Sequence, residues 1–177
     1  MTTNPVLKPK LATPALILSS AAVTICVIYV VGSMAANGPA TLILMLAASA
    51  AFLLAAKVGA IWFVRARRLR IWTAAADKKW QEFDDLKRTR GTTTAVTVLS
   101  VDALEPTGSW ITIKWEHFDH IQSAWLEALN EPIWPGAVLL ISPDPAQVRP
   151  GAPWPTIYYI QAASYLGWAP LAAKRPS

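Results

Sequence analysis

The sequence predicts an α+β membrane protein with an N-terminal transmembrane helical hairpin, an amphipathic stalk helix and a small antiparallel β barrel or sandwich. Three observations support this class: a long uncharged stretch near the N-terminus, a stripe of apolar residues at helical spacing after it, and short strand-like segments beyond Gly91. The expected regions are a tail at 1–13, the hairpin at 14–64, the stalk helix at 65–90, the β domain at 91–170 and a second tail at 171–177.

The uncharged stretch covers residues 11–56, which are 46 positions without Asp, Glu, Lys or Arg. One membrane-spanning helix needs about 20 apolar residues, so the stretch is long enough for two. Its middle contains residues that break helices or favour turns, namely Gly32, Ser33, Asn37, Gly38 and Pro39. We therefore predict helices over 14–34 and 40–64. A cleaved signal peptide is disfavoured, because a typical signal core has only about 7–15 apolar residues.

Basic residues flank the uncharged stretch on both sides. Lys8 and Lys10 precede it, and the segment between the two predicted helices carries no charge. Four arginines follow the second helix, at Arg65, Arg67, Arg68 and Arg70. Short segments rich in Lys and Arg stay on the cytoplasmic side of a membrane. We therefore expect a two-pass protein of the cell (inner) membrane with both termini in the cytoplasm.

The segment 65–90 combines positive charge with an apolar helical stripe. It contains nine basic and four acidic residues, a net charge of +5. Apolar residues recur at a spacing of three or four, at Leu69, Trp72, Ala76, Trp80, Phe83 and Leu86. Such a helix can lie on anionic headgroups, pack on its own soluble domain or form a seam with a partner, and its amphipathicity alone does not choose among these roles. Its candidate membrane-surface or anion-binding residues are Arg65, Arg67, Arg68, Arg70, Lys78 and Lys79.

The remainder of the chain reads as a small β domain. Segments 92–101, 110–115, 137–142 and 156–163 are rich in β-branched, aromatic or alternating apolar residues, as in strands. Turn signals separate them, including Glu105-Pro106-Thr107-Gly108 and Pro150-Gly151. The first two segments resemble a hairpin, and 120–129 fits either a short helix or a third strand. Several short strands in a domain of this size predict a barrel or sandwich.

Tryptophan is concentrated in this domain, which holds six of the nine in the chain. A domain this small has a limited core, so we expect one or two of them to face a partner or lipid. The candidate partner-binding residues are Trp154 and Trp168 of this domain, together with Trp72, Trp80 and Phe83 of the stalk helix. Residues 91–177 carry four basic and seven acidic residues, a net charge of −3, which opposes nucleic-acid binding by the β domain itself.

Motifs that carry chemistry are scarce. Both histidines occur in Glu116-His117-Phe118-Asp119-His120, but this spacing matches no standard zinc signature. A polar strand end or loop explains the group better than a metal site, which usually needs about three or four ligands. The sequence has no GxxxxGK[ST], GxGxxG or GxSxG motif. We therefore expect no enzyme activity, no catalytic residues, no metal and no cofactor.

The run Pro-Gly-Ala-Val-Leu-Leu-Ile-Ser-Pro-Asp-Pro at 135–145 follows the predicted hairpin. This pattern, over residues 94–148, resembles that of small bacterial proteins with two spans and a cytoplasmic β domain. The rich use of Ala, Arg, Trp and Pro, together with size and layout, is similar to that of actinobacterial proteins, in particular the spread proteins of Streptomyces conjugative plasmids of the KilB type. This second resemblance implies a role in moving a plasmid between hyphal compartments.

The layout favours a non-enzymatic, self-associating protein that supports a membrane assembly, and the resemblance adds plasmid transfer and intermycelial spread as its most specific version. The expected partners are the lipid bilayer and either further copies of the chain or other membrane proteins. The alternative is a membrane-surface module that recruits or senses anionic lipid or nucleic acid through the basic stalk. The acidic residues interleaved in the stalk disfavour direct nucleic-acid binding without excluding it.

Overall fold

The computed structural model describes residues 4–37, 42–149 and 151–174, and these residues divide into two compact units. The helical unit comprises Pro9–Ile71. The β unit comprises the residues up to Lys8 together with those from Trp72 onward. The N-terminal segment is thus part of the same unit as the β strands, although the helical unit separates them along the chain.

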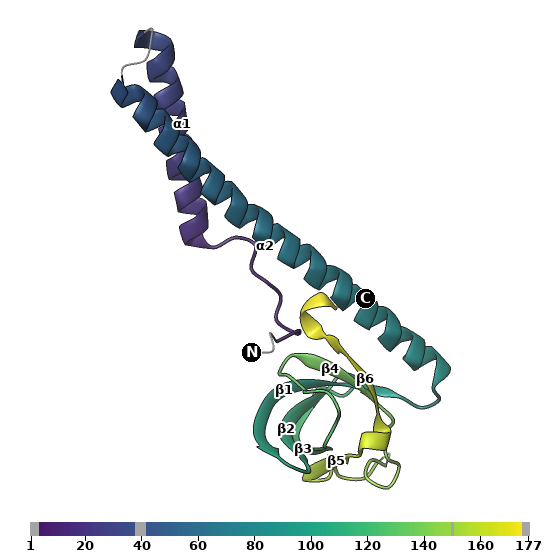
Figure 1. Ribbon diagram of the computed structural model, residues 1–177. Helices are drawn as coiled ribbons and strands as arrows, with labels where there is room; N and C mark the ends of the chain where they lie inside the picture. Colours follow the sequence, from purple (N-terminus) through teal and green to yellow (C-terminus); the bar gives the residue numbers. More distant parts are fainter. Residues whose placement is uncertain (1–3, 38–41, 150, 175–177) are drawn as a thin grey trace. The chain divides into compact units, whose positions relative to one another are not determined.

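Two helices dominate the first half of the chain (Figure 1). Helix α1 (Pro14–Asn37) begins where the sequence predicts, with a proline at its first position, where the missing N–H costs nothing. Helix α2 (Leu42–Thr89) contains both the second apolar run and the stalk segment, since no proline interrupts 42–89 and Gly91 follows its end. Of the predicted turn, Gly38 and Pro39 lie outside the described residues, as does the predicted start of the second helix at Ala40.

Two polar contacts join the helices inside the helical unit. The Trp62 indole N–H donates to the Ser20 hydroxyl at 2.9 Å, and the Arg65 guanidinium donates to the Thr13 hydroxyl at 3.3 Å. Ser20 lies in the first part of α1 and Thr13 directly precedes it, whereas Trp62 and Arg65 lie far from the start of α2 at Leu42. The two helices therefore run antiparallel within this unit.

The β unit contains one six-stranded sheet in the order β5-β3-β2-β1-β4-β6. The strands are β1 (Thr94–Glu105), β2 (Gly108–Trp115), β3 (His120–Glu127), β4 (Ala137–Ile141), β5 (Ile157–Ile160) and β6 (Tyr165–Pro170). The α+β class and the β1–β2 hairpin are confirmed, and residues from His120 form a third strand. The predicted antiparallel barrel or sandwich is wrong, because the sheet is not closed and β3 pairs with β5 in parallel. A parallel pair needs a crossover connection, so β5 cannot continue the hairpin pattern of the strands before it.

Both faces of β4 are buried, which explains its uninterrupted apolar sequence. Successive side chains of a strand point to opposite faces, so β4 contributes to two clusters. Leu139 and Ile141 belong to the main core of the sheet, and Val138 and Leu140 belong to a second cluster with Phe83 of α2. The last part of α2 therefore packs on one face of β4 and β6.

The N-terminal segment inserts one side chain into the main core. Val6 is only 3% exposed and packs among the core residues of the sheet. The Asn4 side chain accepts a hydrogen bond from the Val6 backbone N–H at 2.9 Å, and the Pro5 carbonyl accepts one from the Trp72 indole at 2.8 Å. Gly136, at φ 83°, lies beside Val6, where an added Cβ would approach the valine side chain to 3.1 Å.

Candidate functional site

The helical unit exposes most of its apolar surface. Among the described residues, α1 and α2 each contain an apolar window long enough to cross a membrane, and only 6% of either window is buried. Exposed side chains include Leu18, Ile25, Tyr29, Ile43 and Phe52. The core helix of a water-soluble protein would be mostly buried, and soluble monomers rarely expose contiguous apolar patches of this extent.

The basic candidate residues fall into two groups. Arg65, Arg67, Arg68 and Arg70 belong to the helical unit, where Arg65 is tied to Thr13 and the other three are exposed. Lys78 and Lys79 belong to the β unit and lie 3.9 and 3.8 Å from the Glu82 carboxylate. Lys79 also lies 5.4 Å from the centre of the Trp168 ring. The arginines are therefore the candidates whose charge is least occupied by acidic groups on the same unit.

The apolar stripe of the stalk is used for packing within the β unit. Phe83 is 4% exposed and packs with Trp80 and Leu86 on Val138 and Leu140. The Trp80 indole donates to the Pro170 carbonyl at 3.1 Å, which ties the helix to the end of β6. Of the three roles open to the stripe, the structure therefore shows packing on its own domain for this part of it.

The remaining partner candidates are held within the β unit. The Trp72 indole donates to the Pro5 carbonyl, as described above. Trp168 is buried in the main core, and its indole donates to the Glu131 carboxylate at 3.0 Å. Trp154 is partly exposed and lies in a cluster of aromatic rings. Trp154 is therefore the candidate of the β domain with surface free for a ligand.

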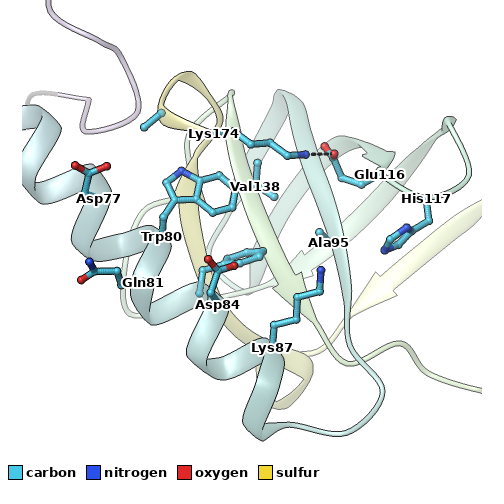
Figure 2. A pocket seen from close by; sticks show the side chains of 12 residues that line it. Asp77, Trp80, Gln81, Asp84, Lys87, Ala95, Glu116, His117, Val138 and Lys174 are labelled. Carbon is cyan, nitrogen blue, oxygen red and sulfur yellow. Dashed lines mark hydrogen bonds and ion pairs between the residues drawn. The ribbon is translucent and has the colours of Figure 1, made fainter. Parts of the chain in front are cut away.

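A groove of about 560 Å³ with charged residues on both sides lies between the last part of α2 and the sheet (Figure 2). Its helix wall includes Trp80, Asp84 and Lys87. The other wall includes Glu116, which directly follows β2, and Lys174, near the end of the described chain. The Lys174 ammonium lies 2.5 Å from the Glu116 carboxylate, which also accepts a hydrogen bond from the Thr97 hydroxyl. Burial raises the pKa of Glu116, but the bonds from Lys174 and Thr97 outweigh it and hold that pKa below its usual range.

The Glu116 carboxylate of this groove is not a free acid or base. A general base works best with a pKa near the operating pH, whereas Glu116 is held ionised and paired. His117 lies at the edge of the groove and is exposed, and His120 stacks on Trp154 with a ring nitrogen 3.2 Å from the Gln122 amide oxygen. Across 4–37, 42–149 and 151–174, no three His, Cys, Asp or Glu side chains come together as a metal site requires.

A second cavity, the aromatic pocket, has a volume of about 700 Å³ and is mainly apolar. Trp115, Phe118 and Trp154 supply its aromatic surface. Prolines line much of the rest, at Pro143, Pro145, Pro153 and Pro155. Sequence reasoning singled out Trp154 but missed the pocket, because its walls come from the β2–β3 turn, the start of β1 and the β4–β5 connection. The five prolines in 143–155, two of them flanking Trp154, were the available signal.

The outer face of the sheet carries a row of aromatic side chains, which we call the aromatic row: Trp110, Trp125 and Tyr159. They sit at paired positions of β2, β3 and β5. The Trp110 and Trp125 rings meet edge to face with centroids 5.0 Å apart. Gly108 allows this arrangement, since an added Cβ would come within 2.6 Å of the Trp125 ring. In β2, Ile111 and Ile113 point to the buried face, so Trp110 lies on the opposite face. This alternation was the sequence signal for the outer face.

Comparison with known proteins adds no relative. No protein-family model matches the chain, and neither the curated proteins nor the solved structures contain a match.

Proposed function

We propose that this chain is a non-enzymatic integral membrane protein that supports a larger membrane assembly. The observation that carries the proposal is the exposure of the two apolar helices. Only 6% of the apolar window of each helix is buried. Leaving such side chains in water costs roughly 1.5–3 kcal/mol each. A bilayer covers them without any further partner, and lipid-facing helices are free to pack against other membrane helices.

The β unit contains residues from both sides of the helical unit, which supports a two-pass topology. The chain leaves this unit after Lys8, passes through the helical unit and returns at Trp72. Val6 is buried in the main core, so the residues before α1 and those after α2 fold together. Two spans satisfy this requirement, because an even number of crossings returns the chain to the side on which it began. The exposed arginines Arg67, Arg68 and Arg70 favour the cytoplasmic side.

The test of this proposal is the state of the chain in membranes. Full-length protein is expressed, the membranes are washed at alkaline pH, and the resistant fraction is transferred to lipid nanodiscs and to a mild detergent. We expect the chain to stay in the washed membrane and to show a mass above that of one copy, or to retain other membrane proteins. A chain released by the wash, or one that is monomeric and without partners in both environments, would contradict the proposal.

The most specific version of the proposal is an accessory in plasmid transfer and intermycelial spread. Its support is the likeness of size, composition and layout to plasmid spread proteins, together with a basic segment next to the apolar helices. Deleting the gene from a transmissible plasmid should leave donor-to-recipient transfer in place while the zone of spread around each donor shrinks. An unchanged zone would remove this version and leave the membrane assembly itself in place.

A second candidate function is recruitment of anionic lipid or nucleic acid, which the exposure of Arg67, Arg68 and Arg70 favours. Each basic residue near an anionic surface contributes about 1 kcal/mol, and the attraction falls with salt. Replacing all three by Gln should weaken binding of nanodisc-held protein to anionic vesicles or to DNA. The matched control replaces Arg88 and Arg90, exposed basic residues of the β unit. Equal binding by both variants and the unmodified chain would exclude this function.

A further inference from the structure

We propose that the aromatic pocket of the β unit binds a small amphipathic anion: a flat apolar body that carries one carboxylate or phosphate group. The inference goes beyond a supporting role in a membrane assembly, since it gives the β unit a ligand of its own. It stands on the size and chemistry of the pocket, on the packing that fixes its walls, and on the sign of its charge.

The pocket has the dimensions and lining of a ligand site. Its volume of about 700 Å³ lies within the range of roughly 300–1,000 Å³ that is usual for small-molecule pockets. Such pockets combine aromatic and aliphatic walls with a few polar groups. Trp115, Phe118 and Trp154 supply aromatic lining here, and Thr92, Thr93 and Thr94 supply lining from neutral polar residues.

Ring contacts fix the aromatic wall in place. The Trp154 ring stacks on His120 at 4.5 Å between centroids, and lies 5.3 Å from Trp115 and 5.5 Å from Phe118. Trp115 is buried and in turn meets Tyr158 edge to face at 5.0 Å. A ligand that enters therefore finds the rings already arranged, and less ordering opposes its binding.

Hydrogen bonds fix the first part of the β4–β5 connection, which also lines the pocket. The Gln147 side chain accepts from the Tyr159 backbone N–H at 2.7 Å and donates to the Tyr159 carbonyl at 3.0 Å, so it pairs with β5 as a neighbouring strand would. The Asp144 carboxylate accepts from the Ala146 N–H and from Gln147, and these bonds lower its pKa. The segment that carries Val148 and Arg149 is thus tied to the sheet.

The charge of the pocket selects the ligand. Arg149 lines the pocket and is exposed, and its Nε donates to the Pro145 carbonyl at 3.4 Å. None of the described residues that line the pocket carries a carboxylate; Asp144, next to the lining, is occupied by the Ala146 N–H and by Gln147. An apolar body fits the rings, and an anionic group opposite Arg149 is paired by a guanidinium. A cationic ligand would meet Arg149 without an acidic partner.

The test uses a matched pair of probes, 2-naphthoate and 2-naphthamide, which share one flat body and differ in the anionic group. The full chain, labelled with 5-fluorotryptophan and held in nanodiscs, is titrated with each probe and followed by fluorine NMR. Single Trp→Phe variants assign the resonances. The chain supplies its own internal control, because Trp110 and Trp125 lie on the aromatic row outside the pocket.

We expect 2-naphthoate to shift the Trp154 resonance while those of Trp110 and Trp125 stay in place. Its dissociation constant should be about threefold lower than that of 2-naphthamide, the effect of one partly exposed charge pair. Arg149→Gln should remove this preference and leave binding of the amide unchanged, whereas Arg90→Gln, outside the pocket, should preserve it. The proposal is overturned if neither probe shifts Trp154, if both bind equally to the unmodified chain, or if Arg149→Gln keeps the preference.

Discussion

The helical unit exposes its apolar side chains, whereas the β unit buries them, and two phenylalanines of the same helix show this difference. Phe52, in the part of α2 that belongs to the helical unit, is 72% exposed. Phe83, in the part that belongs to the β unit, is 4% exposed and packs on Val138 and Leu140. The residue type and the secondary structure are the same, so the difference lies in what covers the ring.

The comparison shows that a high apolar content can reflect either an internal core or an exposed apolar surface within one chain. In the β unit the cover is internal, because the sheet and the last part of α2 bury one another. In the helical unit Phe52 is exposed, and in the proposed membrane protein a bilayer covers it, where burial of such a side chain is worth roughly 1.5–3 kcal/mol. Substitutions in the β unit should therefore change its free energy of unfolding, and substitutions in the helical unit should change the membrane state of the chain.

The largest expected effect comes from Phe83→Ala. Truncating a buried phenylalanine leaves a cavity and usually costs about 3–5 kcal/mol, and we expect about 3 here, since Trp80 and Leu86 beside it are only partly buried. The free energy of unfolding of the β unit, followed by tryptophan fluorescence in denaturant with the full chain in nanodiscs, should fall by that amount. Phe52→Ala is the control and should leave this free energy unchanged. Equal losses in both variants would remove the distinction between the two halves of α2.

A charge in the helical unit should act on the membrane state instead. Leu53 is exposed near the middle of the second apolar run, and an arginine at the centre of a span costs about 2.5–3.5 kcal/mol of insertion free energy. Leu53→Arg should therefore reduce the fraction of chain that stays in membranes after an alkaline wash. Leu104→Arg, at an exposed leucine of β1, is the matched control and should stay in the membrane fraction. A wild-type fraction for Leu53→Arg would show that the run does not span.

The parts of the fold that sequence could predict are those written in local patterns. Each membrane-spanning helix is a continuous apolar segment, so the long uncharged stretch predicts two helices. The run 137–141 predicts a buried strand because all its residues are apolar. Strand β6 escaped prediction, since Gly167 and Pro170 interrupt its pattern. The parallel pairing of β5 with β3 also escaped, because the order of strands in a sheet depends on contacts between distant segments.

The candidate sites show the same limit. The stalk stripe predicts an apolar helix face but not its partner, and for Phe83 that partner is the chain's own β4. Val6 gives no signal at all, because one valine in a short tail has no periodicity, and only the folded β unit shows the space that it fills. The aromatic pocket likewise exists only once Trp115, Phe118 and Trp154 are brought together from separate segments.

A smaller effect should come from the N-terminal segment, where neighbouring residues differ in burial as the two phenylalanines do. Val6 is buried in the main core and Leu7 is exposed. Val6→Ala should lower the free energy of unfolding of the β unit by about 2 kcal/mol, from lost apolar burial and the space left behind. Leu7→Ala should change it little. If both variants have the same free energy of unfolding as the unmodified chain, the N-terminal segment does not pack on the β unit. The support that this packing gives to a two-pass topology is then lost.

The smallest effect is a pH dependence within the β unit, centred on Glu116. Its folded-state pKa is held below the ordinary value of 4.5, so the ion pair with Lys174 stabilises the fold at neutral pH and is lost as the pH falls through the lowered pKa. Because the pair is partly exposed, the contribution should be less than about 1 kcal/mol. Glu116→Gln should therefore unfold more easily than the unmodified chain at pH 7, and the two should converge as the pH is lowered below that pKa. Glu82→Gln, on the exposed face of α2, removes only exposed pairs at 3.8 and 3.9 Å, so its difference from the unmodified chain at pH 7 should be smaller. A Glu116→Gln difference that stays constant with pH would mean that shape or hydrogen bonding at this position, and not the charge of the carboxylate, stabilises the groove.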